Sequence, residues 1–253
     1  MLQLQDSKGV VLLEEVEPAI RARDLRVSYG ERYVLRGVDF EVAWGEFLIV
    51  FGANGAGKTT LMRLLATLQR PNKGSVHVAG VDVWERPSAV RGLIGVVTHQ
   101  TLLYDNLTVR ENLKFYCKMY HIVDADSRID TLLQAVGLED YATRRTRILS
   151  HGMQKRLALA RSLLHNPPIL LLDEPDSGLD HEAQIRLATL LKSEVSQGNR
   201  TVVMTTHNLE RGLALGDRVM ILANGRIVYQ EYKSALNLAT FRDTYEQFTG
   251  DRL

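Results

Sequence analysis

The chain has 253 residues, of which 45% are hydrophobic and 24% charged, and its formal net charge is +1. This composition is ordinary for a globular protein, and a net charge so close to zero gives no electrostatic reason to expect nucleic-acid binding. The length is near the upper limit for one hydrophobic core, so we expect one α/β domain with a smaller subdomain.

Targeting and membrane signals are missing from the sequence. No apolar stretch approaches the ~20 residues that span a bilayer. The first residues lack the basic, then apolar, then small-residue pattern of a signal peptide. The single cysteine, Cys117, excludes an internal disulfide framework and suits a reducing compartment. We therefore expect a cytoplasmic protein that reaches a membrane only through a partner.

The first hundred residues are predicted to be mainly strands around one helix. Residues 1–19 form an acidic leader without a clear role, and strands are expected between Ile20 and Phe51, where apolar and polar residues alternate. A glycine-rich loop follows, and then a helix to about Leu68. Further strands are expected at Ser75–Val78 and Leu93–Val97.

Residues 100–165 change character and are predicted to be helical. Thr108–Glu111 has the form of a capping box, which opens a helix. Apolar residues then recur at helical spacing from Ile129 to Val136, and Gly137 is a plausible end of that helix. A third helix is expected to begin near Gln154.

The remaining chain alternates between strand and helix, and it ends in a tail, residues 234–253, for which we expect helix. Asn224-Gly225 is predicted to form a two-residue hairpin turn. The expected elements are a strand at Ile169–Leu172, a helix at Glu182–Ser196, a strand at Thr201–Thr205, a helix at Leu209–Leu215, and strands at Arg218–Leu222 and Arg226–Tyr229.

Phe51–Thr60 contains the pattern G-x-x-x-x-G-K-[ST] between an apolar strand and a helix, the context in which it marks a phosphate-binding loop rather than a turn without a ligand. Its glycines let successive N–H groups turn toward phosphate oxygens, and the helix N-terminus adds its positive dipole end. Lys58 is expected to reach the β- and γ-phosphates, and the Thr59 hydroxyl to bind Mg²⁺. The predicted nucleotide-binding residues of this loop are Gly52, Asn54, Gly55, Gly57, Lys58, Thr59 and Thr60.

Two carboxylates follow the apolar strand Ile169–Leu172. Asp173, at the strand tip, is placed to hold Mg²⁺ beside the phosphates. Glu174 is expected to polarise the attacking water as a general base. Acidic residues often begin a loop, but next to a phosphate-binding loop the catalytic interpretation is favoured.

The sequence Leu149–Gln154 resembles the signature loop of the ABC (ATP-binding cassette) ATPases, in which Ser150 and Gly152 are the groups expected to touch phosphate. His151 replaces the first glycine of the family's motif, and Met153 stands where its glutamine is expected, with Gln154 one place later. The family's other motifs are present in the family's order along the chain. Before the signature loop, Tyr29 (with Tyr33 as a rival) resembles the aromatic that stacks on adenine, and Gln100 resembles the Q-loop glutamine, a magnesium ligand. After it, Ser177–Asp180 resembles the D-loop with Asp180, and His207 resembles the switch histidine. Asp176, just before the D-loop, is less usual than a neutral residue there.

The resemblance implies an α/β fold, a P-loop NTPase core of the ABC ATPase type at residues 20–233, with an N-terminal antiparallel β-subdomain and an inserted α-helical subdomain at about 100–165. It also implies a head-to-tail dimer around two ATP molecules with Mg. Lys58, Thr59 and Asp173 would hold one nucleotide, while Ser150, Gly152 and Gln154 come from the second ATPase subunit. Glu174, His207 and Lys58 would be the catalytic residues.

A separate transmembrane permease is the further partner that the resemblance implies, with the chain peripheral on the inner face of the cell membrane. Two stretches, His99–Thr108 and Leu149–Arg161, look similar to the heme-exporter ATP-binding subunit of bacterial cytochrome c maturation. Cys117, Met119 and His121 lack a C-x-x-C-H motif and are not expected to bind heme themselves. The alternatives are an ATPase subunit of a drug or lipid exporter, a soluble ABC ATPase acting on ribosomes or DNA, and a silent nucleotide-binding module.

Overall fold

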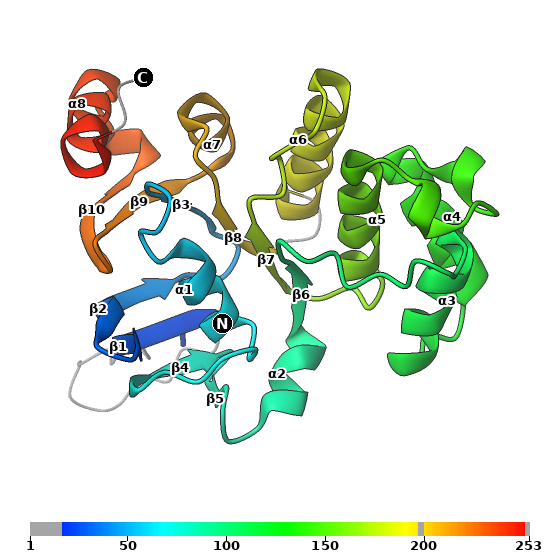
Figure 1. The fold of residues 1–253 in the computed structure, drawn as a ribbon, viewed down its shortest axis with the longest axis horizontal. Coiled ribbons are helices and arrows are strands. Elements are labelled where there is room, and N and C mark those ends of the chain that lie inside the picture. The colour runs from blue at the N-terminus through cyan, green and yellow to red at the C-terminus, as the bar shows by residue number, and fades with distance from the viewer. Residues whose placement is uncertain (1–16, 197–199, 251–253) are drawn as a thin grey trace, which may run out of the picture.

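Two β-sheets and the helices around them make up the structure, a computed structural model that describes residues 17–196 and 200–250 (Figure 1). The strands are β1 (Ile20–Tyr29), β2 (Arg32–Val42), β3 (Phe47–Phe51), β4 (Lys73–Val78), β5 (Val81–Asp82), β6 (Ile94–Val97), β7 (Ile169–Asp173), β8 (Thr201–Thr205), β9 (Arg218–Ala223) and β10 (Arg226–Tyr232). The α-helices are α1 (Lys58–Leu65), α2 (Pro87–Leu93), α3 (Val109–Met119), α4 (Ala125–Val136), α5 (His151–Leu163), α6 (His181–Ser196), α7 (Leu209–Leu215) and α8 (Leu238–Thr249). Single 3-10 turns lie at Glu139–Tyr141, Thr146–Ile148 and Lys233–Ala235.

The larger sheet has the strand order β10-β9-β3-β8-β7-β6, and its strands from β9 to β6 are parallel. Both of its faces are covered, so β3 and β7 are apolar along nearly their whole length. Phe47, Ile49 and Phe51 of β3 pack into one core cluster, whereas Leu48 and Val50 pack into the other. This alternation joins the two clusters through one strand.

The smaller sheet is antiparallel, in the order β2-β1-β4-β5. Its apolar face shares a core cluster with Leu61, Leu64 and Leu65 of α1. Figure 1 shows this sheet on the side of the parallel sheet opposite to α6, α7 and α8. The expected α/β architecture, with an antiparallel subdomain and an inserted helical part, is therefore the observed one.

Helices α3, α4 and α5 form the helical part, which lies beyond β6 and beside α6 (Figure 1). The predicted capping box is confirmed, because Thr108 accepts from the Glu111 N–H and the Glu111 carboxylate accepts from the Thr108 N–H. The predicted end of α4 is also confirmed, since Gly137 has a left-handed backbone with φ 64°. Asn112, fully buried, donates to the Thr146 hydroxyl at 2.8 Å and so joins α3 to the segment before α5.

Two helix boundaries were predicted wrongly. Helix α1 ends at Leu65 and not at Leu68, because Thr67 takes a left-handed backbone with φ 61° and the Leu68 N–H turns back to the Arg63 carbonyl. Helix α5 begins at His151 and not near Gln154, because the Ser150 side chain caps it by accepting from the Met153 N–H. In each case a residue other than glycine ends or begins the helix.

The predicted hairpin turn is confirmed by positive φ at both of its residues, 49° at Asn224 and 76° at Gly225. A Cβ atom at Gly225 would lie 2.3 Å from the Val34 carbonyl oxygen, so this position also needs glycine for space. After the hairpin, α8 folds back and buries Phe241 and Tyr245 against Phe51.

Residues 1–16, most of the expected leader, lie outside the described residues. No helix in the part of the chain that the structure describes has the length and apolar character needed to cross a membrane.

Candidate nucleotide-binding and catalytic site

The loop between β3 and α1 is shaped around the ammonium group of Lys58. Its Nζ donates to the carbonyl oxygens of Gly52 at 2.6 Å and Ala53 at 3.3 Å, and the residue is only 5% exposed. Gly52 has φ 156°, and a Cβ atom there would lie 2.3 Å from the Leu222 carbonyl oxygen. The backbone carbonyls of the loop therefore hold the Lys58 ammonium group at the start of α1.

The same loop leaves backbone donors unused. Within the described residues, the N–H groups of Gly55, Gly57, Lys58 and Thr59 form no backbone hydrogen bond. A Cβ atom at Gly55 would meet nothing within 4 Å, so the tip of the loop faces open space. Unpaired N–H groups at a helix N-terminus, with an ammonium group beside them, fit phosphate oxygens.

Asp173 and Glu174 lie at the carboxyl end of β7, where the neighbouring strand β8 ends at Thr205. The Thr205 hydroxyl donates to Asp173 Oδ1 at 2.7 Å, and the Glu174 N–H donates to the same hydroxyl oxygen at 3.0 Å. Glu174 takes a left-handed backbone with φ 47°, which costs a non-glycine residue on the order of 1 kcal/mol or more. Thr205 thus fixes both carboxylate residues from an adjacent strand.

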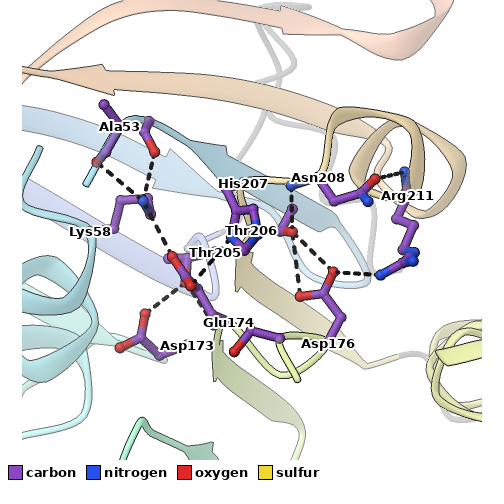
Figure 2. Close-up of polar contacts among 12 residues, drawn as sticks. Ala53, Lys58, Asp173, Glu174, Asp176, Thr205, Thr206, His207, Asn208 and Arg211 are labelled. Atoms are coloured by element: carbon purple, nitrogen blue, oxygen red, sulfur yellow. Dashed lines mark hydrogen bonds and ion pairs between the residues drawn. The ribbon is translucent and has the colours of Figure 1, made fainter. Parts of the chain in front are cut away.

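The Glu174 carboxylate lies between the ammonium group of Lys58 and the imidazole of His207 (Figure 2). Its Oε1 is 3.4 Å from Lys58 Nζ, and its Oε2 is 3.4 Å from Nδ1 of His207. The Lys58 end of this row is buried, whereas His207 is 58% exposed. The three predicted catalytic residues are therefore brought together, with the imidazole on the open side.

Oxygen donors for a magnesium ion are present beside this row. Thr59 is exposed and carries a hydroxyl group. Among the described residues, the Asp173 carboxylate has only Thr205 as a hydrogen-bond partner. Hydroxyl and carboxylate oxygens are ligands that Mg²⁺ prefers, so these residues fit the ion. Gln100 is exposed just after β6, and its backbone oxygen accepts from the Thr98 hydroxyl.

Tyr29 and Tyr33 lie near the β1–β2 turn, where Tyr29 pairs with Arg32 and Tyr33 with Ser28, and each tyrosine is 55% exposed. The Tyr29 hydroxyl donates to Gln69 Oε1 at 2.8 Å, which anchors one edge of its ring and leaves much of the side chain accessible. Both rings could stack on a base, so the choice between them stays a prediction.

The signature residues occupy the start of α5, which lies beside the D-loop. A Cβ atom at Gly152 would be 3.5 Å from the Gly178 carbonyl oxygen. The Gln154 amide donates to the carbonyls of Thr146 and Leu149, both at 3.4 Å, so it stabilises its own loop. Asp180 caps α6 by accepting from the Ala183 N–H at 2.8 Å. In the described part of the chain, no hydrogen bond or ion pair joins these signature residues to the phosphate-binding loop.

Lys155, for which the sequence predicted no role at the site, is buried and ties α5 to the catalytic segment. Its Nζ donates to the carbonyls of Glu174 at 3.2 Å and Ser177 at 2.7 Å, and to the Ser177 hydroxyl. Burial lowers the pKa of this ammonium group, and the negative charges of Asp176 and Glu174 oppose that shift. Lys155 stands between Gln154 and Arg156, so no local pattern in the sequence indicated that it is buried.

Asp176 also acquires partners that the sequence did not predict, Thr206 and Arg211. Thr205, Thr206 and Arg211 carry no motif of their own, and only strand pairing brings them to the site.

Comparison with known proteins agrees with this geometry. A family model described as ABC transporter matches residues 35–177. The chain is 36% identical over 222 residues to the Nod factor export ATP-binding protein I of Paraburkholderia xenovorans (strain LB400), covering 87% of this chain and 73% of that protein. It is 37% identical over 229 residues to the daunorubicin resistance ATP-binding protein DrrA3 of Streptomyces coeruleorubidus, covering 90% and 72%.

A solved structure extends the likeness to three dimensions. The ATP-binding cassette MJ0796, in a dimeric post-hydrolysis state bound to ADP and Pi, superposes with a TM-score of 0.80 at 28% identity, over 86% of this chain and 100% of that chain. The family match spans more than half of the present sequence and includes the phosphate-binding loop, the signature loop and both carboxylates. The chain therefore belongs to the ABC transporter family, of which it is an ATPase domain.

Proposed function

We propose that this chain is the ATP-hydrolysing subunit of a membrane exporter and drives a separate permease. The observation that carries the catalytic part is the row Lys58–Glu174–His207, in which one carboxylate lies 3.4 Å from an ammonium group and 3.4 Å from an imidazole. A carboxylate in this position can orient and polarise a water molecule. The buried ammonium group and the unused N–H groups of the loop would stabilise negative charge on phosphate oxygens.

Lys58, Thr59 and Asp173 would hold the nucleotide and its Mg²⁺, which neutralises phosphate charge when bound. His207, on the exposed side of Glu174, would complete the site next to the γ-phosphate. The wild-type protein is therefore expected to hydrolyse ATP, and Lys58→Ala is expected to abolish hydrolysis. Measurable turnover by Lys58→Ala close to that of the wild type would contradict the assignment.

The proposed working unit is a dimer, either of two copies or of this chain with a second ATPase subunit. Gly152 lies beside the D-loop of its own chain, and in the described residues neither Ser150 nor Gly152 forms a hydrogen bond with the phosphate-binding loop. A signature loop so placed would act on the nucleotide of the opposite subunit. The similar cassette MJ0796, solved as a dimer with ADP and Pi, supports this arrangement.

The proposed contact with a permease is an apolar groove between the parallel sheet and the helical part. It is lined by residues that include Leu68, Leu102, Tyr116 and Tyr120. Leu102 is 46% exposed and Leu68 51%, which is unusual for large apolar side chains gathered at one place. Gln100 precedes this groove in sequence and would couple it to the nucleotide site. A peripheral location on the inner face of the cell membrane follows from this proposal.

For the cargo we propose heme handling or export for cytochrome c biogenesis, on the resemblance of the Gln100 and Ser150 regions to heme-exporter subunits. The names of the relatives favour a second candidate, drug export, because one of them is named a daunorubicin resistance ATP-binding protein. The two are separated by mass spectrometry of the proteins that co-purify with tagged Glu174→Gln protein from gently solubilised membranes with ATP. Cytochrome c maturation subunits would support heme, and another permease would support drug or lipid export. Ribosomes or DNA-repair proteins without a membrane subunit would contradict the transport role.

A further inference from the structure

Asp176 is a buried carboxylate two residues after Glu174, and its contacts run away from the phosphate-binding loop. The residue is 4% exposed. The Thr206 hydroxyl donates to its Oδ2 at 3.1 Å and lies 3.4 Å from its Oδ1 (Figure 2). Nη1 of Arg211 lies 3.7 Å from the same Oδ2. The buried charge is thus satisfied by one hydroxyl and one guanidinium group, as a buried carboxylate requires.

These partners surround His207 in the sequence. Thr206 directly precedes His207, and Asn208 directly follows it. The Thr206 hydroxyl oxygen accepts from the Asn208 N–H at 3.0 Å. The Asn208 side chain then caps α7 by accepting from the Arg211 N–H, also at 3.0 Å. The Asp176 carboxylate therefore joins both neighbours of His207 and the first turn of α7 into one hydrogen-bonded unit.

Within this unit, Asp176 is separated from Glu174 only by Pro175. His207 itself is 58% exposed and contacts Glu174 at 3.4 Å. An exposed side chain on a short connection between β8 and α7 keeps a fixed position only if its backbone is held. Thr205 holds the start of this connection, because its carbonyl and hydroxyl oxygens accept from the Glu174 N–H at 3.2 and 3.0 Å. The Thr206–Asp176 hydrogen bond adds a second restraint one residue closer to His207.

We propose that Asp176 is a positioning residue, which holds the Thr206–Asn208 segment so that His207 stays beside Glu174. The proposal rests on the roles proposed above for Glu174 and His207. Asp176 does not face the phosphate-binding loop and is not assigned any contact with ATP. Its effect on hydrolysis passes through His207.

The alternative is that Asp176 only stabilises the fold by pairing buried charges. Lys155 approaches the same segment from α5 and donates to the carbonyls on either side of Asp176, at Glu174 and Ser177. A purely structural carboxylate would balance Lys155 and Arg211 without any link to His207. The two roles differ in whether the effect of removing Asp176 depends on His207.

A double-mutant cycle measures this dependence. Single-turnover ATP hydrolysis is measured with excess full-length protein, for the wild type, Asp176→Ala, His207→Ala and the double variant. Asp176→Ala is expected to lower the hydrolysis rate about tenfold or more, since small misplacements of catalytic groups have effects of this size. ATP affinity is expected to change less than about twofold, because the nucleotide contacts lie elsewhere. In the His207→Ala background, Asp176→Ala is expected to change the rate less than about twofold.

Two further variants separate positioning from folding. Thr206→Val removes the hydroxyl at nearly constant volume and is expected to lower the rate as much as Asp176→Ala, whether or not the latter is stable. Asp176→Asn keeps an acceptor for the hydroxyl and is expected to recover most of the wild-type rate. Glu46→Gln is the matched control, because it disturbs a buried pair with Arg218, at the amino end of β3 and β9 and away from the site. Glu46→Gln is expected to lower the unfolding temperature and to leave the rate unchanged.

Equal rate losses from Asp176→Ala with and without His207 would overturn the proposal, and so would a wild-type rate for Thr206→Val. Either result would still be compatible with the proposed ATPase function, provided that His207→Ala itself hydrolyses ATP more slowly than the wild type. Wild-type turnover by His207→Ala would instead refute the catalytic role of His207, and with it the role given to Asp176.

Discussion

Replacing Glu174 by glutamine removes one negative charge and leaves the shape of the site nearly unchanged. The carboxylate lies 3.4 Å from both Lys58 Nζ and His207 Nδ1 and is held by a strained backbone with φ 47°. If it acts as the general base, its loss removes a contribution of about 10²- to 10⁴-fold to the rate. At about 1.4 kcal/mol for each factor of ten, the barrier to hydrolysis rises by about 3–5.5 kcal/mol.

Binding of ATP is expected to survive this change. Lys58 Nζ is also bound by the carbonyls of Gly52 and Ala53, so its position does not depend on Glu174. Without the neighbouring carboxylate, the ammonium group has one fewer negative group competing with phosphate. Because the nucleotide binds and is not consumed, Glu174→Gln is expected to trap an ATP-bound dimer.

Two assays check these expectations. Phosphate release gives the rate, and size-exclusion chromatography with and without ATP gives the oligomeric state. Glu210→Gln is the matched control, since it makes the same chemical change at an exposed position three residues after His207. The control is expected to hydrolyse ATP at the wild-type rate. A normal rate for Glu174→Gln would refute its assignment as the base.

Three other changes, with Arg242→Ala as a control for one of them, probe the site and the fold. Lys58→Ala is expected to abolish hydrolysis and weaken ATP binding, which titration with a fluorescent ATP analogue measures. Phe241→Ala removes a buried ring that packs on β3 and is expected to lower the free energy of unfolding by about 3–5 kcal/mol in urea titrations. Arg242→Ala, an exposed neighbour, is expected to change the free energy of unfolding by less than about 0.5 kcal/mol. Asn112→Ala removes the partners of the Thr146 hydroxyl and of the Tyr104 N–H, and is expected to cost roughly 1–3 kcal/mol for each buried group left unpaired.

Local patterns in the sequence predicted the parts of the site that local chemistry determines. The phosphate-binding loop was predictable because its glycines, Lys58 and the following helix are contiguous. The turn at Asn224-Gly225 was predictable for the same reason, since its two residues are the ones that adopt positive φ most readily. The end of α1 was missed because Thr67, which takes the left-handed conformation there, is not a residue that signals a helix end.

The packing of distant segments was not predictable from such patterns. Helix was expected in the tail, but nothing in residues 234–253 indicated that Phe241 and Tyr245 would pack on Phe51 at the other end of the chain. Lys155 was similarly unassigned, because its acceptors, the carbonyls of Glu174 and Ser177, are backbone groups that carry no sequence signal.

Asp176 shows how sheet topology turns an unexplained residue into an interpretable one. Its charge was visible in the sequence as a departure from the family, but its partner Thr206 lies 30 residues further along. The parallel strands β7 and β8 pair Asp173 with Thr205, so the two segments that follow these strands leave the sheet at the same edge. The residues that follow these strands, Asp176 after β7 and Thr206 after β8, therefore lie next to each other at this edge. Both side chains are buried, so the Thr206 hydroxyl donates the hydrogen bond that the Asp176 carboxylate would otherwise accept from solvent. The register of two strands therefore accounts for a contact that neither segment predicts alone.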